Sequence, residues 1–160
     1  MEICFLGTGT PKPDPLRCGS GTAVIGDDGL SWVLVDCGRG VTQRALQAGL
    51  DLSALTAVAL THHHSDHVSD LASLAITRFT GGAPSRLRVI APLGPSARFA
   101  ESCLDGYEDQ AFYSQREAGI AERPALQVET FGASPEPVTV LDDGRWLVRS
   151  AEVLDRVRAG

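Results

Sequence analysis

Seven consecutive residues decide the fold: Thr61-His62-His63-His64-Ser65-Asp66-His67. Divalent transition metals bind neutral imidazoles and carboxylates at about 2.0 to 2.2 Å, and a tight turn can present four such groups together. Side chains alternate along an extended segment, so His62 and His64 point the same way and can bind one ion. Asp66 and His67 would face a second ion. The stretch therefore predicts a two-metal site.

A solvated polar loop is the alternative interpretation of these histidines, with their clustering a compositional accident. The context argues against it, because the chain has four histidines and all fall within six residues. In the metal-site interpretation His63 points away from the ions.

The segments on either side of the motif place it at the edge of a sheet. Leu55 to Thr61 is an apolar run suited to a buried strand. From about Asp66 to Thr80, apolar residues recur at spacings of three and four, which predicts a helix. The histidines would therefore lie at the carboxyl end of a strand, just before a helix.

The residues before the motif predict an antiparallel start to the sheet. Runs rich in aliphatic and β-branched residues predict strands at Glu2–Gly7, Thr22–Gly26 and Trp32–Asp36. The turn Gly26-Asp27-Asp28-Gly29 favours a hairpin between the second and third strands. A short helix is expected over Gly40–Gly49, with the last glycine as its stop.

The residues after the motif predict fewer elements. Leu87–Ala91 is expected to form a strand and Gly94–Leu104 a helix, while Asp105–Arg123 shows no clear period. Val138–Leu141 and Trp146–Ser150 flank Asp-Asp-Gly-Arg, which is a strong hairpin signal.

Composition is that of a globular domain, with 43% hydrophobic and 21% charged residues in 160. A net charge of -6 excludes an overall positive field for nucleic acid, so an RNA partner would need a local basic patch. We expect a cytoplasmic protein without membrane contact, because the start has no basic leader and no run is apolar enough. The four scattered cysteines indicate free thiols.

The pattern His-x-His-x-Asp-His after an apolar strand resembles the hallmark of the metallo-β-lactamase superfamily. Phe5-Leu6-Gly7-Thr8-Gly9-Thr10-Pro11, and Asp36-Cys37-Gly38 followed by Gln43, resemble the ribonuclease Z branch. The resemblance is good from Met1 to about Ala91. It implies an α/β fold, the αββα sandwich, with a mixed, largely antiparallel sheet and flanking helices.

The resemblance also implies roles for the motif residues. His62 and His64 would bind a first zinc ion, and Asp66 and His67 a second, with Asp66 as candidate proton acceptor. Asp36 would be a carboxylate that orients a ligand imidazole. A turn former at the end of a strand is an equally good interpretation of Asp36.

The implied activity is zinc-dependent hydrolysis of phosphodiester bonds, as in removal of the 3′ trailer from precursor transfer RNA. One alternative is another hydrolase of this fold, acting on small sulfate, cyclic phosphate or carboxylate esters. The other is a catalytically incomplete half-domain that at most binds metal or joins an assembly.

The second half of the expected site is missing. Complete members of the family supply a third histidine, a bridging aspartate and a final histidine, but no histidine follows His67. Leu154-Asp155-Arg156 stands where the third histidine is expected, and the tail from Ala151 to Gly160 could be a last helical turn. We therefore expect residues 1–160 to be a single domain that is incomplete at its C-terminus. Its exposed inner sheet face would recruit a partner, a second copy being one option, or would aggregate.

Overall fold

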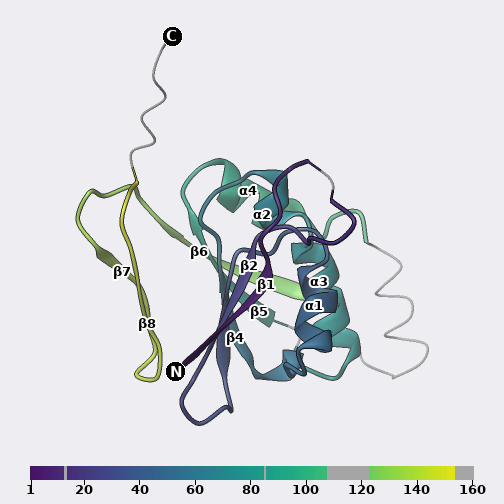
Figure 1. Ribbon diagram of the computed structural model, residues 1–160. Helices are drawn as coiled ribbons and strands as arrows, with labels where there is room; N and C mark the ends of the chain where they lie inside the picture. Colours follow the sequence, from purple (N-terminus) through teal and green to yellow (C-terminus); the bar gives the residue numbers. More distant parts are fainter. Residues whose placement is uncertain (13, 85, 108–122, 154–160) are drawn as a thin grey trace.

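The computed structural model describes residues 1–12, 14–84, 86–107 and 123–153. Most of them belong to or flank a six-stranded sheet, whose arrangement can be followed in Figure 1. Across the sheet the strands follow their order in the sequence: β1 Glu2–Gly7, β2 Gly21–Ile25, β3 Trp32–Val35, β4 Leu55–Ala59, β5 Arg86–Pro92 and β6 Ala125–Phe131. The predicted mixed sheet is confirmed. The expectation that it is largely antiparallel is wrong, because three of its five pairings, from β3 to β6, are parallel.

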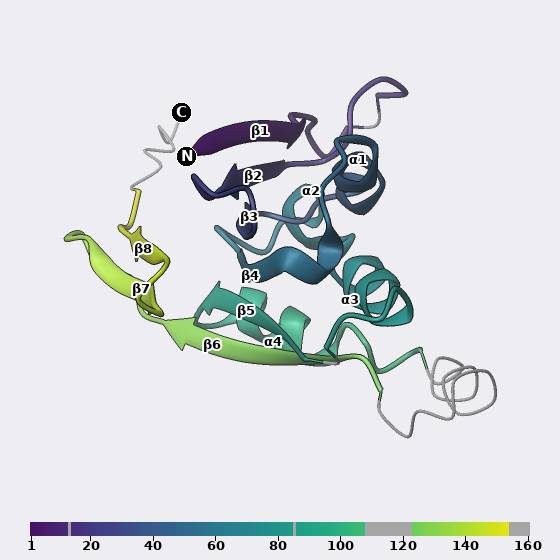
Figure 2. The same ribbon diagram turned by 90° about the horizontal axis from the view of Figure 1, so that it is seen from below.

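Helices form the connections between the parallel strands, as such pairings require. They are α1 Val41–Gln47, the 3₁₀ helix η1 Leu52–Ala54, α2 Ser65–Val68, α3 Leu71–Thr80 and α4 Pro95–Ser102. Figure 2 shows α1 to α4 on one face of the sheet. Leu34, Val58 and Val89 of the sheet are fully buried there in one cluster with Leu71 and Leu74 of α3. Burial of each such side chain contributes about 1.5 to 3 kcal/mol.

The helix predicted from Asp66 to Thr80 is instead two helices, α2 and α3, that are separated at Ser69 and Asp70. Asp70 explains the break. Its backbone N–H donates to the carbonyl of Cys37 at 3.0 Å, and its carboxylate accepts from the N–H of Thr42 at 2.7 Å. These contacts keep Asp70 out of a continuous helix, and they attach this part of the chain to the start of α1.

Strand β6 lies outside the segments that the sequence predicts as strands. Its residues do alternate: Leu126 and Val128 pack against the helix-side cluster, while Glu129 on the other face binds Arg88 of β5. The alternation of apolar and polar residues is hard to detect in the sequence of β6, because this strand has polar side chains on a face that is usually apolar.

The predicted C-terminal hairpin is confirmed, as β7 Val138–Asp142 and β8 Leu147–Ser150. It lies on the sheet face opposite the helices (Figure 2). Leu141 and Trp146 pack there in one cluster with the sheet residues Val33, Ala57 and Ile90, all 8% exposed or less. The expectation of an exposed inner face is therefore wrong at the centre of the sheet. It holds at β1, where Ile3 and Phe5 are exposed.

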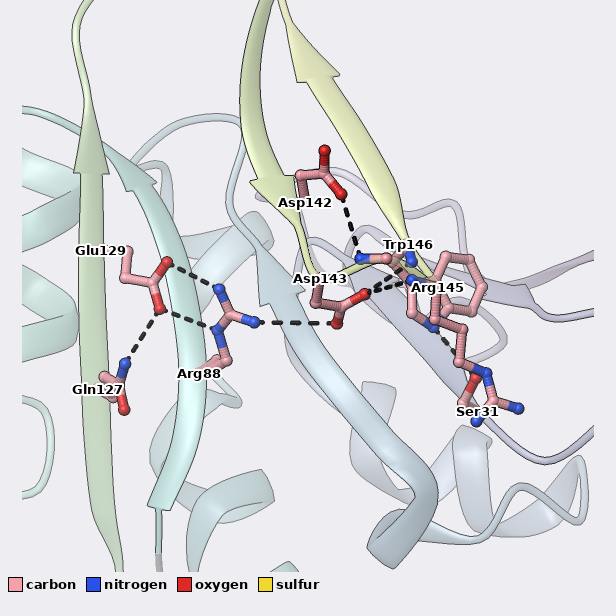
Figure 3. Close-up of polar contacts among 9 residues, drawn as sticks. Ser31, Arg88, Gln127, Glu129, Asp142, Asp143, Arg145 and Trp146 are labelled. Carbon is pink, nitrogen blue, oxygen red and sulfur yellow. Dashed lines mark hydrogen bonds and ion pairs between the residues drawn. The ribbon is translucent and has the colours of Figure 1, made fainter.

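Polar contacts attach the turn of this hairpin to the sheet (Figure 3). The Arg88 guanidinium donates two hydrogen bonds to Glu129, both of 2.9 Å, and lies 3.9 Å from the Asp143 carboxylate. The indole N–H of Trp146 donates to Ser31 at 3.1 Å, and both atoms are buried. The hairpin is therefore held by an apolar contact and by directional bonds.

None of the described helices has the length and apolar character needed to cross a lipid bilayer. The stretch that the sequence leaves unassigned, 105–123, falls mostly outside the described residues, as does the end of the tail from residue 154.

Candidate metal centre

The motif occupies the edge of the sheet where β1, β3, β4 and β5 all end. His62 to His64 follow β4, and Asp66 and His67 belong to α2. The loop after β1 packs directly on α2, since the N–H of Ser20 donates to the carbonyl of Asp66 at 2.7 Å. This packing needs glycine at position 38, because a Cβ there would lie 1.8 Å from the Asp66 carbonyl oxygen.

Asp36, just after β3, is the centre of the local hydrogen bonds. It is 4% exposed and has a φ of 61°, a left-handed conformation that aspartate tolerates better than most residues. Its carboxylate accepts from the backbone N–H of Thr61 at 2.8 Å, from the Thr61 hydroxyl at 2.9 Å and from the Ser20 hydroxyl at 3.3 Å. Backbone strain of about 1 to 3 kcal/mol is offset by these bonds.

The same carboxylate orients two histidines. The Nδ1–H of His67 donates to Asp36 Oδ2 at 2.7 Å, which leaves His67 Nε2 with a free lone pair. The single Thr61 hydroxyl proton is directed to Asp36, so Thr61 Oγ1 accepts a hydrogen bond of 3.0 Å from the Nδ1–H of His62. His62 Nε2 is then free as well.

The imidazoles of His62, His64 and His67 form a compact group. The ring centroid of His62 lies 4.6 Å from that of His64 and 4.0 Å from that of His67. Burial lowers the pKa of His62, and repulsion from His67 and His64 lowers it further. A lowered pKa keeps the His62 ring neutral at pH 7, the form in which imidazole binds metal.

Asp66 provides the unexplained polar atom of the site. The residue is 5% exposed, and its Oδ1 atom is buried without a hydrogen-bond partner among the described residues. Its Oδ2 atom lies 3.5 Å from His67 Nε2. A buried carboxylate oxygen without a partner is costly, so its presence suits a site that receives a cation or a proton.

The potential metal ligands do not complete the coordination of any one ion. Within residues 1–12, 14–84, 86–107 and 123–153, no three His, Cys, Asp or Glu side chains are placed so that they could hold one ion. The structure brings His62, His64 and His67 together and places Asp66 Oδ2 3.5 Å from His67 Nε2, and the expected division into two ligand pairs stays a prediction. Imidazole rings oriented by outer hydrogen bonds and a carboxylate oxygen without a partner fit a transition metal in chemistry, though not in number.

A cavity of about 870 Å³ opens beside the histidines, between the sheet and the β7–β8 hairpin. His62, His64 and Thr61 line one end of it. His63 is exposed and is not among the lining residues.

Sequence reasoning gave no role to Thr61 or Ser20, although both bind Asp36. Thr61 was visible as the residue that precedes the histidines, but a hydroxyl has no spacing rule that would single it out. Phe131 and Arg149, which also line the cavity, come from the far end of the chain. The pairing of β6 with β5 brings Phe131 to the site, and the packing of the hairpin brings Arg149.

Comparison with known sequences gives a family and a set of relatives. Residues 16–158 match the model described as "Metallo-beta-lactamase superfamily". Ribonuclease Z of Mycobacterium bovis (strain BCG / Pasteur 1173P2) is 39% identical over 139 residues, covering 84% of this chain and 49% of the relative. Ribonuclease Z of Mycobacterium sp. (strain KMS) is 47% identical over 144 residues, covering 88% of this chain and 45% of the relative. The chain thus spans about half the length of the curated relatives it matches.

Comparison with solved structures supports the same fold. The short form of human tRNase Z has a TM-score of 0.66 at 20% identity, covering 98% of this chain and 62% of that one. YhfI of Bacillus subtilis, a metallo-beta-lactamase fold protein, has a TM-score of 0.55 at 22% identity, covering 86% of this chain and 48% of that one. At these identities the similarity concerns the fold.

Proposed function

The chain belongs to the metallo-beta-lactamase superfamily, and from that premise we propose that it serves zinc-dependent hydrolysis of phosphodiester bonds, in the manner of ribonuclease Z. The proposed substrate is precursor transfer RNA, cut endonucleolytically at its 3′ side. The observation that carries the proposal is a chain of hydrogen bonds that joins His62 to Thr61, Thr61 to Asp36 and Asp36 to His67. It leaves the Nε2 atoms of both histidines free, near the buried Oδ1 of Asp66.

His62 and His64 would hold one zinc ion, and Asp66 and His67 the second. Bound zinc supplies a water of lowered pKa and a positive charge for the phosphodiester oxygen under attack. Asp36 keeps the His67 ring in one tautomer through its 2.7 Å hydrogen bond. Asp66 would accept the proton of the attacking water at Oδ1.

The number of donors limits the strength of binding. Catalytic zinc sites usually have three protein ligands, whereas each pair here supplies two, so we expect these residues alone to bind zinc weakly. A metal-binding half-domain without turnover is the second candidate function. It is favoured by the absence of a three-donor group among the described residues.

Zinc content and RNA cleavage test the proposal together. We expect the purified chain to bind zinc, to cleave precursor transfer RNA and to lose that cleavage when a chelator is added. The matched pair is His62→Ala and His63→Ala: the first should reduce zinc binding at least tenfold, roughly the effect of losing one ligand or its support, while the second should leave it unchanged.

Each outcome has a distinct meaning. Zinc binding without cleavage of RNA or of aryl esters would support the half-domain. Hydrolysis of aryl sulfates or carboxylates with none of RNA would favour a small-ester hydrolase. Equal zinc affinity in the His62 and His63 variants would reject the proposed ligands.

A further inference from the structure

We propose that the cavity between the sheet and the β7–β8 hairpin receives an unpaired nucleobase of the substrate, with its phosphodiester at His62 and His64. The inference rests on the proposed function, because it names the group that lies next to the bond to be cleaved. It concerns the part of the cavity that lies away from the metal motif.

The lining of the cavity combines polar and apolar side chains. Thr61, His62 and His64 line it at the sheet edge, and Arg149 and Glu152 add one cationic and one anionic side chain to the lining. Much of the remaining lining is apolar, including Ile90 and the end of β6. A ligand that fits both parts has a polar end that meets the histidines and a flat or apolar end, as a nucleotide does.

The floor of the cavity is hollowed by a small residue. Val35, Ala59 and Ile90 are aligned neighbours on β3, β4 and β5, so they share the face that looks toward the hairpin. Ile90 is 1% exposed, whereas Val35 and Ala59 are half-buried. Alanine between two branched side chains leaves a shallow depression, which a planar ring can fill.

Phe131 supplies an aromatic wall. It is the last residue of β6, and its carbonyl accepts a hydrogen bond from the N–H of Leu93 at 2.9 Å, which fixes its backbone. Its side chain packs on the hairpin-side cluster but remains half-buried. Aromatic side chains in such positions stack on unpaired bases irrespective of base identity.

The size of the cavity agrees with this occupant. At about 870 Å³ it lies in the range of about 300 to 1,000 Å³ that is usual for small-molecule sites, and it is far larger than a phosphate alone requires. Because it is continuous with His62 and His64, an occupant would be held within reach of the proposed metal ligands.

Equilibrium binding of small probes to the full chain tests the pocket without any cleavage. Adenosine has the base and no ester, so its binding depends neither on zinc nor on hydrolysis. We expect calorimetry to detect adenosine and not ribose. Phe131→Ala should weaken adenosine binding about tenfold, as expected for loss of one stacking contact.

Phe5→Ala is the matched control, because Phe5 is 73% exposed on β1 and does not line this cavity. If Phe131→Ala does not fold, Phe131→Leu keeps an apolar side chain and still removes the ring, so it should show the same direction of effect.

Adenosine affinity equal in the Phe131 and Phe5 variants, or no adenosine binding at all, would overturn the inference. Tighter binding of phenol than of adenosine would overturn the assignment to a nucleobase. Because hydrolysis is not measured, adenosine binding can succeed or fail independently of the proposed enzymatic activity.

Discussion

Asp36 is the residue that turns a sequence motif into an organised site. The sequence left its role open between a turn former and a partner of a ligand imidazole, and the structure gives it both features. Its left-handed backbone turns the chain after β3, and its carboxylate binds Thr61 and His67. The ligand roles proposed for His62, His64, Asp66 and His67 rest on alternation and family resemblance and stay predictions. The contribution of Thr61 could not be predicted, because it depends on two segments that meet only in the folded protein.

At the scale of a single residue, Asp36→Asn tests this organisation. Asparagine tolerates the same backbone conformation but lacks the negative charge that stabilises the Nδ1–H tautomer of His67. We expect zinc affinity to fall by about 10- to 100-fold, the usual effect of removing such a partner. Competition with a chromophoric chelator measures it, and Asp142→Asn, in the distant hairpin turn, serves as control. Unchanged affinity in Asp36→Asn would show that the ring is oriented by other contacts.

At the scale of elements, prediction succeeded where local pattern and packing agree. β1 to β5 and the C-terminal hairpin follow from runs of aliphatic residues between turn signals. β6 was missed because Glu129 lies on its inner face, where an apolar residue is usual. Glu129 is stabilised there by a hydrogen bond from Arg88, forty-one residues earlier in the sequence. The break between α2 and α3 was missed because it depends on the contact of Asp70 with Thr42. Both failures come from long-range polar partners.

The docking of the hairpin depends on Trp146, whose side chain fills the contact with the sheet. Trp146→Ala should destabilise this contact by about 3 to 5 kcal/mol, the range for removing a large buried aromatic residue. Hydrogen exchange of β7 and β8 amides should therefore accelerate, and a dye that binds apolar surface should become more fluorescent. Leu147→Ala is the control, because that neighbour is 56% exposed. Equal exchange rates in the two variants would contradict the proposed anchor.

At the scale of the whole molecule, the sheet is covered differently on its two faces. Helices bury one face in a large cluster, while the other has a smaller cluster under a single hairpin and is open at β1. The hairpin face also has the polar contacts of Figure 3, so charge contributes to how the sheet is covered there.

This arrangement predicts a loss of stability in acid. Hydrogen bonds from Arg88 lower the pKa of Glu129, and the backbone N–H of Trp146 with other nearby donors lowers the pKa of Asp143. The folded state therefore binds fewer protons than the unfolded state, and the stability contributed above the ordinary pKa of about 4 is lost as the pH falls through the lower folded values. Both groups are partly exposed, so each contribution should stay below about 1 kcal/mol.

Urea unfolding between pH 6 and pH 3 measures this effect. The free energy of unfolding of Glu129→Gln should fall less steeply with acid than that of the unmodified chain. Glu136→Gln, at an exposed position, should follow the unmodified chain. Identical slopes for all three proteins would mean that the Arg88 contact does not contribute to stability.

The change in strand direction at β3 also bears on how the chain acquires its fold. Residues 8–20 connect β1 to β2 and residues 26–31 connect β2 to β3, whereas more than thirty residues separate β5 from its partner β6. A contact between distant segments requires a larger loss of chain entropy before its own interactions can stabilise the protein, so such contacts form later. As the polypeptide leaves the ribosome, the antiparallel strands β1, β2 and β3 should therefore pair first, before β4, β5 and β6 join the sheet. Pulse-labelling of amides during refolding would show β2 protected before β6.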